Sequence, residues 1–93
     1  MRLLYSFRFQ QIGETYLGAA VGQNAHLFNG VLQLNEVGHF IVSQLAQLPD
    51  MQEQNIVNSL TESLTKEYAV DRSTAQTAVQ QVLDYLKSEQ VLA

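Results

Sequence analysis

Residues 28–41 read FNGVLQLNEVGHFI and join two kinds of apolar pattern. An Asn-Gly pair, which is typical of turns and bulges, stands directly before the apolar run Val31–Leu34 and predicts a short strand there. Asn35 is a good N-terminal cap for a helix, and the positive end of that helix favours Glu36. Apolar residues then recur at helical spacing as far as Pro49, which ends the helix. This stretch therefore predicts the last strand of a sheet running directly into the first helix.

Two further strands are predicted before this stretch. Tyr5, Phe7 and Phe9 alternate with polar residues, which is the period of a half-buried strand. After a turn signal at Gly13, a second alternation covers residues 17–21. Because the connections between these runs are short, the three strands are expected to be antiparallel.

Two further helices are predicted after Pro49. Residues 50–53 (DMQE) match a capping box with Asp50 in the capping role, and apolar residues then recur every four positions as far as Tyr68. A third helix begins near residues 71–76, where either Asp71 or Ser73 could be the cap, and runs to about residue 89. The predicted fold class is α+β: a three-stranded antiparallel sheet (about residues 5–34) followed by three helices (about residues 35–90), like a winged helix. The chain is expected to form one domain over residues 1–93.

The third predicted helix has an unusually wide apolar face. At 100° per residue, its apolar side chains occupy an arc of about 160°, against a minimum of about 100° for facing a core. Either this helix packs into a corner between two elements, or one flank packs inward while the other lines an apolar groove. The arc consists of Ala75, Ala78, Val79, Val82, Leu83, Tyr85 and Leu86.

Composition excludes several classes of function. The chain has no Cys, which excludes disulfides, thiolate metal sites and cysteine nucleophiles. No stretch is apolar enough to span a bilayer, and the N-terminus lacks the apolar region of a signal peptide, so a cytoplasmic protein without a membrane partner is expected. The net charge of −4 argues against a binder of duplex DNA, since residues 35–93 carry eight acidic and three basic side chains.

No pattern of residues points to catalysis or to a bound cofactor. The two histidines, His26 and His39, do not have the spacing of a metal site, and His39 is expected at the surface or at the boundary of the core. The glycine-containing run at residues 18–22 lacks the Lys and Ser/Thr of a phosphate-binding loop. The sequence therefore predicts no enzyme activity, no metal and no cofactor.

The stretch at residues 28–41 resembles the PqqD-like family of peptide-binding modules, which are called RiPP recognition elements. The family's most familiar signature is the Leu34-Asn35-Glu36 turn into the first helix. The resemblance continues in the second helix, in residues 67–71 (EYAVD) and in residues 78–86 (AVQQVLDYL), and it covers about residues 5–92. This chain departs from the family at Ala78, where an acidic residue is frequent, and at Gln90, where Gly is frequent.

The resemblance implies the same sheet and helices, and a protein that is not an enzyme. Members bind the leader segment of a ribosomally synthesised precursor peptide and present it to a modifying enzyme, often a radical S-adenosylmethionine enzyme. The leader adds as a fourth strand to the edge of the third strand, and its apolar side chains pack against the third helix. The peptide-binding residues implied here are Asn29, Gly30, Val31, Leu32, Gln33, Ala75, Ala78, Val79, Val82, Tyr85 and Leu86.

The best candidates for the groove are Ala78 and Tyr85, which lie at one margin of the apolar arc, whereas Val82 and Leu86 are expected more often in the core. Two other functions stay open at the level of sequence. One is a winged-helix DNA-binding regulator. The other is a self-associating scaffold, a homodimer in which a second copy covers the exposed sheet edge and groove.

Overall fold

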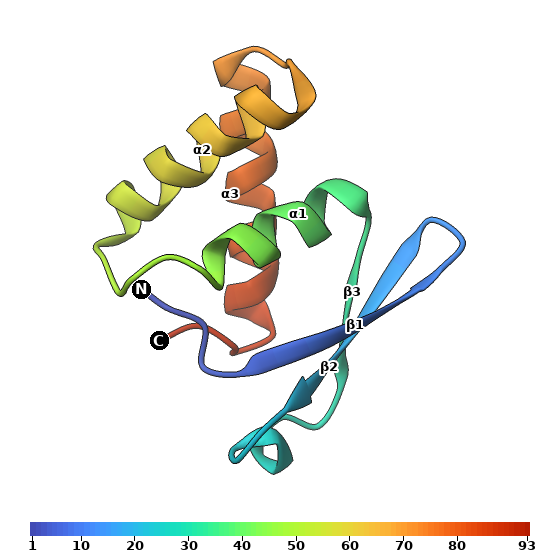
Figure 1. Ribbon diagram of the computed structural model, residues 1–93. Helices are drawn as coiled ribbons and strands as arrows, with labels where there is room; N and C mark the ends of the chain where they lie inside the picture. Colours follow the sequence, from blue (N-terminus) through green and yellow to red (C-terminus); the bar gives the residue numbers. More distant parts are fainter.

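A computed structural model describes all residues, 1–93 (Figure 1). It contains a three-stranded antiparallel sheet followed by three helices, so the predicted fold class is confirmed; the short 3-10 turn η1 was not predicted. In chain order the elements are β1 (Ser6–Ile12), β2 (Thr15–Val21), η1 (Ala25–Leu27), β3 (Val31–Leu34), α1 (Glu36–Leu45), α2 (Glu53–Tyr68) and α3 (Arg72–Ser88).

The sheet has the order β1-β2-β3, with each strand antiparallel to its neighbour. Gly18 in β2 lies between Phe9 of β1 and Leu32 of β3 in the register. A Cβ atom on Gly18 would overlap the ring of Phe9, so the glycine provides the space in which this ring lies across the sheet. The outer strands β1 and β3 each have one edge without a strand partner.

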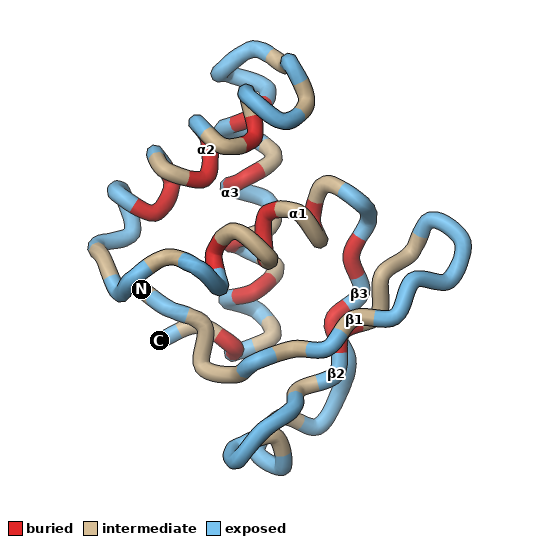
Figure 2. Tube along the Cα trace, in the orientation of Figure 1, coloured by how far each residue is buried: buried red, intermediate tan, exposed pale blue.

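The three helices lie together on one side of the twisted sheet (Figure 1). α1 contacts β2 and β3, and α3 contacts both α1 and α2, so the helices form the larger part of the core. Leu32 and Leu34 point from β3 into this core, while Val31 and Gln33 are exposed, as the alternation of a strand requires. Figure 2 shows the buried residues as bands on the helix faces that are turned toward one another.

Two of the three predicted helix caps are present in the structure. Asn35 Oδ1 accepts a hydrogen bond of 2.8 Å from the Gly38 N–H and so caps α1. Asp71, not Ser73, caps α3, and hydrogen bonds from the Thr74 side chain and backbone lower the pKa of the Asp71 carboxyl group. The prediction that Asp50 caps α2 is wrong.

Asp50 instead accepts a hydrogen bond of 2.8 Å from the Met1 ammonium group, and α2 begins after Gln52 without a side-chain cap. The pKa of Asp50 is lowered by that ammonium group. The two chain ends also pair, through an isolated bridge between Leu3 and Leu92, and they lie close together in Figure 1. None of the helices has the length and apolar character needed to cross a membrane.

Candidate functional site

The free edge of β3 faces the second half of α3. The Gln33 N–H donates a hydrogen bond of 2.9 Å to the Tyr85 hydroxyl, so this N–H points away from β2 and toward α3. Alternate residues of an antiparallel strand direct their backbone groups to alternate sides. Val31 therefore directs its N–H and C=O to the same free edge as Gln33, while Leu32 directs its own toward β2. We call the backbone of residues 29–33 on this side the free edge.

The side chains along the free edge differ in exposure. Asn29, Gly30 and Gln33 are exposed, and Val31 is 51% exposed. Leu32 is fully buried, so its side chain belongs to the core. Of the residues predicted to bind peptide on this strand, the backbone groups and the exposed side chains are therefore accessible, and the side chain of Leu32 is not.

The apolar face of α3 divides into a buried part and a half-buried part. Ala75, Val79 and Leu86 are fully buried and pack in the core with Leu83. Because α3 contacts both α1 and α2, this part fills a corner between two elements, as one of the two interpretations predicts.

The half-buried part consists of Ala78, Val82 and Tyr85, spaced by four and three residues along one side of α3. We call these three residues the α3 flank. Since Tyr85 reaches the Gln33 N–H, the flank lies on the side of the helix nearest the free edge. Ala78 and Tyr85, the best groove candidates, are half-buried, and so is Val82, which was expected more often in the core; all three pack against its margin.

Two hollows lie at the ends of the junction between the free edge and α3, and Tyr85 borders one of them. The first, of about 390 Å³, is lined by Glu14, Thr15, Gln33, Leu34, Asn35 and Tyr85, and we call it the Glu14 hollow. The second, of about 340 Å³, is lined by Tyr5, Leu27, Phe28, Asn29, Ser88, Glu89 and Gln90, and we call it the Glu89 hollow. Ala75, Ala78, Val79, Val82 and Leu86 line neither hollow, so the predicted groove residues of α3 other than Tyr85 lie outside both depressions.

An aromatic cluster that sequence reasoning did not assign to the site borders the Glu89 hollow. The ring of Phe28 stacks on Tyr5 with centroids 5.7 Å apart and meets Phe7 edge-on at 5.8 Å. Tyr5 and Phe28 also line the hollow itself. The crowding of aromatic residues in the first 40 positions is the sequence signal for this cluster.

The charges next to the free edge are acidic. Glu14 lines one hollow and Glu89 the other, and no basic residue lines either. Lys87 Nζ lies 2.9 Å from Glu53 Oε2 on α2, so the base nearest the C-terminal end of α3 is already paired. The alternative of a DNA-reading helix stays a prediction, with Arg72 as the other base on α3.

His39 lies at the boundary of the core, as expected. Its ring stacks on Tyr16 with centroids 4.2 Å apart and meets Phe9 edge-on at 4.8 Å. No three metal-ligating side chains lie close enough together to hold an ion. The contacts of His39 therefore give it a packing role between α1 and the sheet.

Two family-like segments that are distant in sequence meet at the start of α1. The Tyr68 hydroxyl at the end of α2 donates a hydrogen bond of 3.0 Å to Glu36 Oε2. Burial, followed by this contact with Glu36, raises the pKa of Tyr68. The contact ties the Leu34-Asn35-Glu36 turn to the EYAVD segment, and thereby fixes where α1 starts relative to α2.

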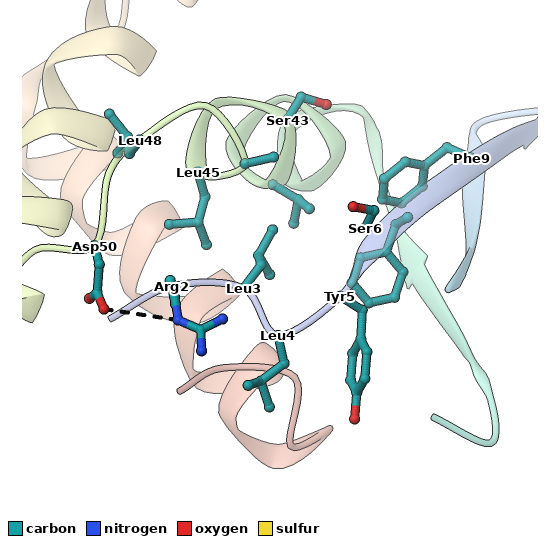
Figure 3. Close-up of a pocket in the computed structure, with 13 residues that line it drawn as sticks. Arg2, Leu3, Leu4, Tyr5, Ser6, Phe9, Ser43, Leu45, Leu48 and Asp50 are labelled. Atoms are coloured by element: carbon teal, nitrogen blue, oxygen red, sulfur yellow. Dashed lines mark ion pairs between the residues drawn. The ribbon is translucent and has the colours of Figure 1, made fainter. Parts of the chain in front are cut away.

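A larger cavity, of about 490 Å³, lies between the N-terminal segment and α1 (Figure 3). Figure 3 shows Leu3 and Leu45 beside it, with the guanidinium group of Arg2 turned toward Asp50 at 3.9 Å. No residue implied as peptide-binding lines this cavity. It adjoins β1, whereas the free edge of the candidate site belongs to β3.

Comparison with known proteins confirms the resemblance. A family model described as "Coenzyme PQQ synthesis protein D (PqqD)" matches residues 24–92. A solved structure described as "TbiB1 in Complex with the TbiA(beta) Leader Peptide" is similar in fold, with a TM-score of 0.63 and 22% sequence identity, covering 99% of this chain and 94% of the other. No curated relative matches the sequence. Because the family model covers most of the chain, including β3 and all three helices, the protein belongs to the PqqD family.

Proposed function

We propose that this protein binds the leader segment of a ribosomally synthesised precursor peptide by strand addition at the free edge, and that it is a binding module with no catalytic role. The observation that carries the proposal is the hydrogen bond between the Gln33 N–H of the free edge and the hydroxyl of Tyr85 on the α3 flank. Membership of the PqqD family supports it, as does the fold shared with a protein that is bound to a leader peptide.

Strand addition suits the chemistry of this edge. An unpaired strand edge offers N–H and C=O groups that an extended peptide can satisfy whatever its side chains are. Val31 and Gln33 supply such groups here. The hydrogen bonds of the added strand provide affinity, and the surfaces under its alternate side chains provide specificity.

The surroundings of the edge favour a leader of a particular character. The α3 flank offers two small or medium apolar side chains, Ala78 and Val82, beside the ring of Tyr85. An apolar leader side chain would pack there, on the N-terminal side of Tyr85 along α3. The acidic residues at the Glu14 and Glu89 hollows favour a leader that also carries basic residues.

The bound leader would then be delivered in trans to a modifying enzyme, which we propose to be of the radical S-adenosylmethionine class. The description of the family as a coenzyme synthesis protein is consistent with a role beside a biosynthetic enzyme. The strand that carries the free edge is short, since β3 has four residues, which suits a transient complex that releases the peptide again.

Titration of the isotopically labelled protein with the leader segment of the precursor encoded beside its gene tests the proposal by NMR. We expect amide shifts in residues 29–33 and 78–85. Val31→Pro removes one N–H from the free edge without affecting the ladder to β2, and should weaken leader binding about tenfold because a leader carbonyl is left unpaired. Val31→Thr keeps both the N–H and the branched side chain and serves as the matched control.

Two results would contradict the proposal. One is the absence of shifts at these positions with the co-encoded leader. The other is equal affinity for the leader in the wild type, Val31→Pro and Val31→Thr. Sedimentation velocity on the same samples distinguishes peptide binding from pairing of two copies through the free edge, since only the latter raises the molecular mass without peptide.

A further inference from the structure

The free edge is already partly occupied by the protein's own side chain. Tyr85 accepts the Gln33 N–H at 2.9 Å, which is an ordinary length for a hydrogen bond. It is the one side-chain hydrogen bond that links the sheet to a helix, and it joins residues 52 positions apart. Exposed strand edges tend to pair with other chains, and proteins commonly cover or block them.

We propose that Tyr85 closes the free edge in the unbound protein and must swing away before a leader strand can pair with Gln33; the inference rests on the proposed function. An N–H has one hydrogen, so the Tyr85 hydroxyl and a leader carbonyl compete for the same donor. The ring of Tyr85 also borders the Glu14 hollow, at one end of the path a leader would follow along the edge.

The surroundings of Tyr85 allow this movement. The residue is half-buried at the margin of the core, and its contact with Gln33 is exposed to solvent, so the ring can leave by rotation about its side-chain bonds and gives up its packing against the core when it does. After rotation the ring can cover the leader or lie over Val82, and the Gln33 N–H becomes available. The Tyr85 hydroxyl thus accepts the Gln33 hydrogen bond that a leader carbonyl would accept in the complex.

This closure has a cost for binding and a benefit for the free protein. If the binding-competent state is only a fraction of the population, the apparent affinity for any peptide falls by that fraction. Weakly matching peptides are then rejected, and self-pairing of two β3 edges is disfavoured. A leader with good side-chain contacts overcomes the closure.

The variant Tyr85→Phe removes the hydroxyl and keeps the ring. Tyr16→Phe is the matched control, since the Tyr16 ring stacks on His39 while its hydroxyl makes no hydrogen bond within the protein. In the protein without peptide, hydrogen exchange of the Gln33 amide should be about fivefold faster in Tyr85→Phe, the effect of losing one hydrogen bond, and unchanged in Tyr16→Phe. Equal Gln33 exchange in the wild type and Tyr85→Phe would overturn the inference.

Calorimetric titration with the co-encoded leader provides the second measurement. Tyr85→Phe should bind the leader about fivefold more tightly than the wild type, and Tyr16→Phe should match the wild type. In the wild type, the nuclear Overhauser contact between the Tyr85 ring and the Gln33 amide should disappear when leader is added. Weaker or equal binding by Tyr85→Phe, with leader binding intact in the wild type, overturns this inference alone. A wild-type protein that binds no leader overturns the proposed function as well.

Discussion

The backbone of Gln90 has a conformation that glycine adopts more easily. Its φ of 60° lies in the left-handed region, directly after α3. The Val91 N–H bonds to the Leu86 carbonyl at 3.2 Å and the Gln90 N–H to the Lys87 carbonyl at 3.0 Å, which is the hydrogen-bond pattern of a Schellman cap. The frequent Gly of the family at this position therefore has a physical reason, and this chain has the same cap without the glycine.

Gln90→Gly should therefore stabilise the protein. The left-handed conformation costs a residue with a Cβ about 1–2 kcal/mol, and glycine avoids this cost. The greater freedom of glycine in the unfolded chain opposes folding and cancels about half of the stabilisation. We expect the free energy of unfolding, measured in urea, to rise by about 0.5–1 kcal/mol. Gln81→Gly, at an exposed position inside α3, is the control and should lower it by about 1 kcal/mol. A lower stability of Gln90→Gly would contradict the role of this cap.

At the level of single elements, local signals were predictable and tertiary contacts were not. The Asn35 cap was predicted because its partner, the Gly38 N–H, lies three residues away. The Asp50 cap failed because the Met1 ammonium group, 49 residues away in sequence, takes the carboxylate instead. The Asn-Gly pair predicted where β3 begins, but no local pattern could show that Tyr85 reaches its edge.

The packing of β2 against β1 depends on Gly18. Gly18→Ala would place a Cβ that overlaps the edge of the Phe9 ring, and this ring also meets His39 on α1. We expect the free energy of unfolding to fall by about 1–3 kcal/mol, the usual cost of inserting a methyl group into a packed region. Ala19→Ser, one residue later on the exposed side of β2, is the control and should change it by less than about 0.5 kcal/mol. Equal stability of the two variants would show that the ring moves aside freely.

Across the whole molecule, the fold and family were more predictable than the shape of the site. The spacing of apolar residues along the chain predicted the three strands and three helices. The wide apolar arc of α3 indicated that this helix could form one side of a groove. The arc alone could not separate the buried residues Ala75, Val79 and Leu86 from the half-buried flank, because that division depends on where α1 and α2 pack. For the same reason the two hollows could not be foreseen.

The uneven distribution of charge over the molecule leads to the last prediction, which rests on leader binding at the free edge. Glu14 comes from the hairpin and Glu89 from the end of α3, so the fold alone brings one acidic residue to each hollow. If basic leader residues lie there, binding should weaken as salt is raised, since exposed charges are screened over about 10 Å at 0.1 M salt.

Glu14→Gln and Glu89→Gln should each weaken leader binding about two- to fourfold in low salt, and the differences should shrink in high salt. Glu62→Gln, on α2 beside Lys66, is the matched control and should leave affinity unchanged. An affinity for the leader that does not depend on salt, with all three variants equal to the wild type, would show that the acidic residues take no part in binding and that apolar and backbone contacts alone select the leader.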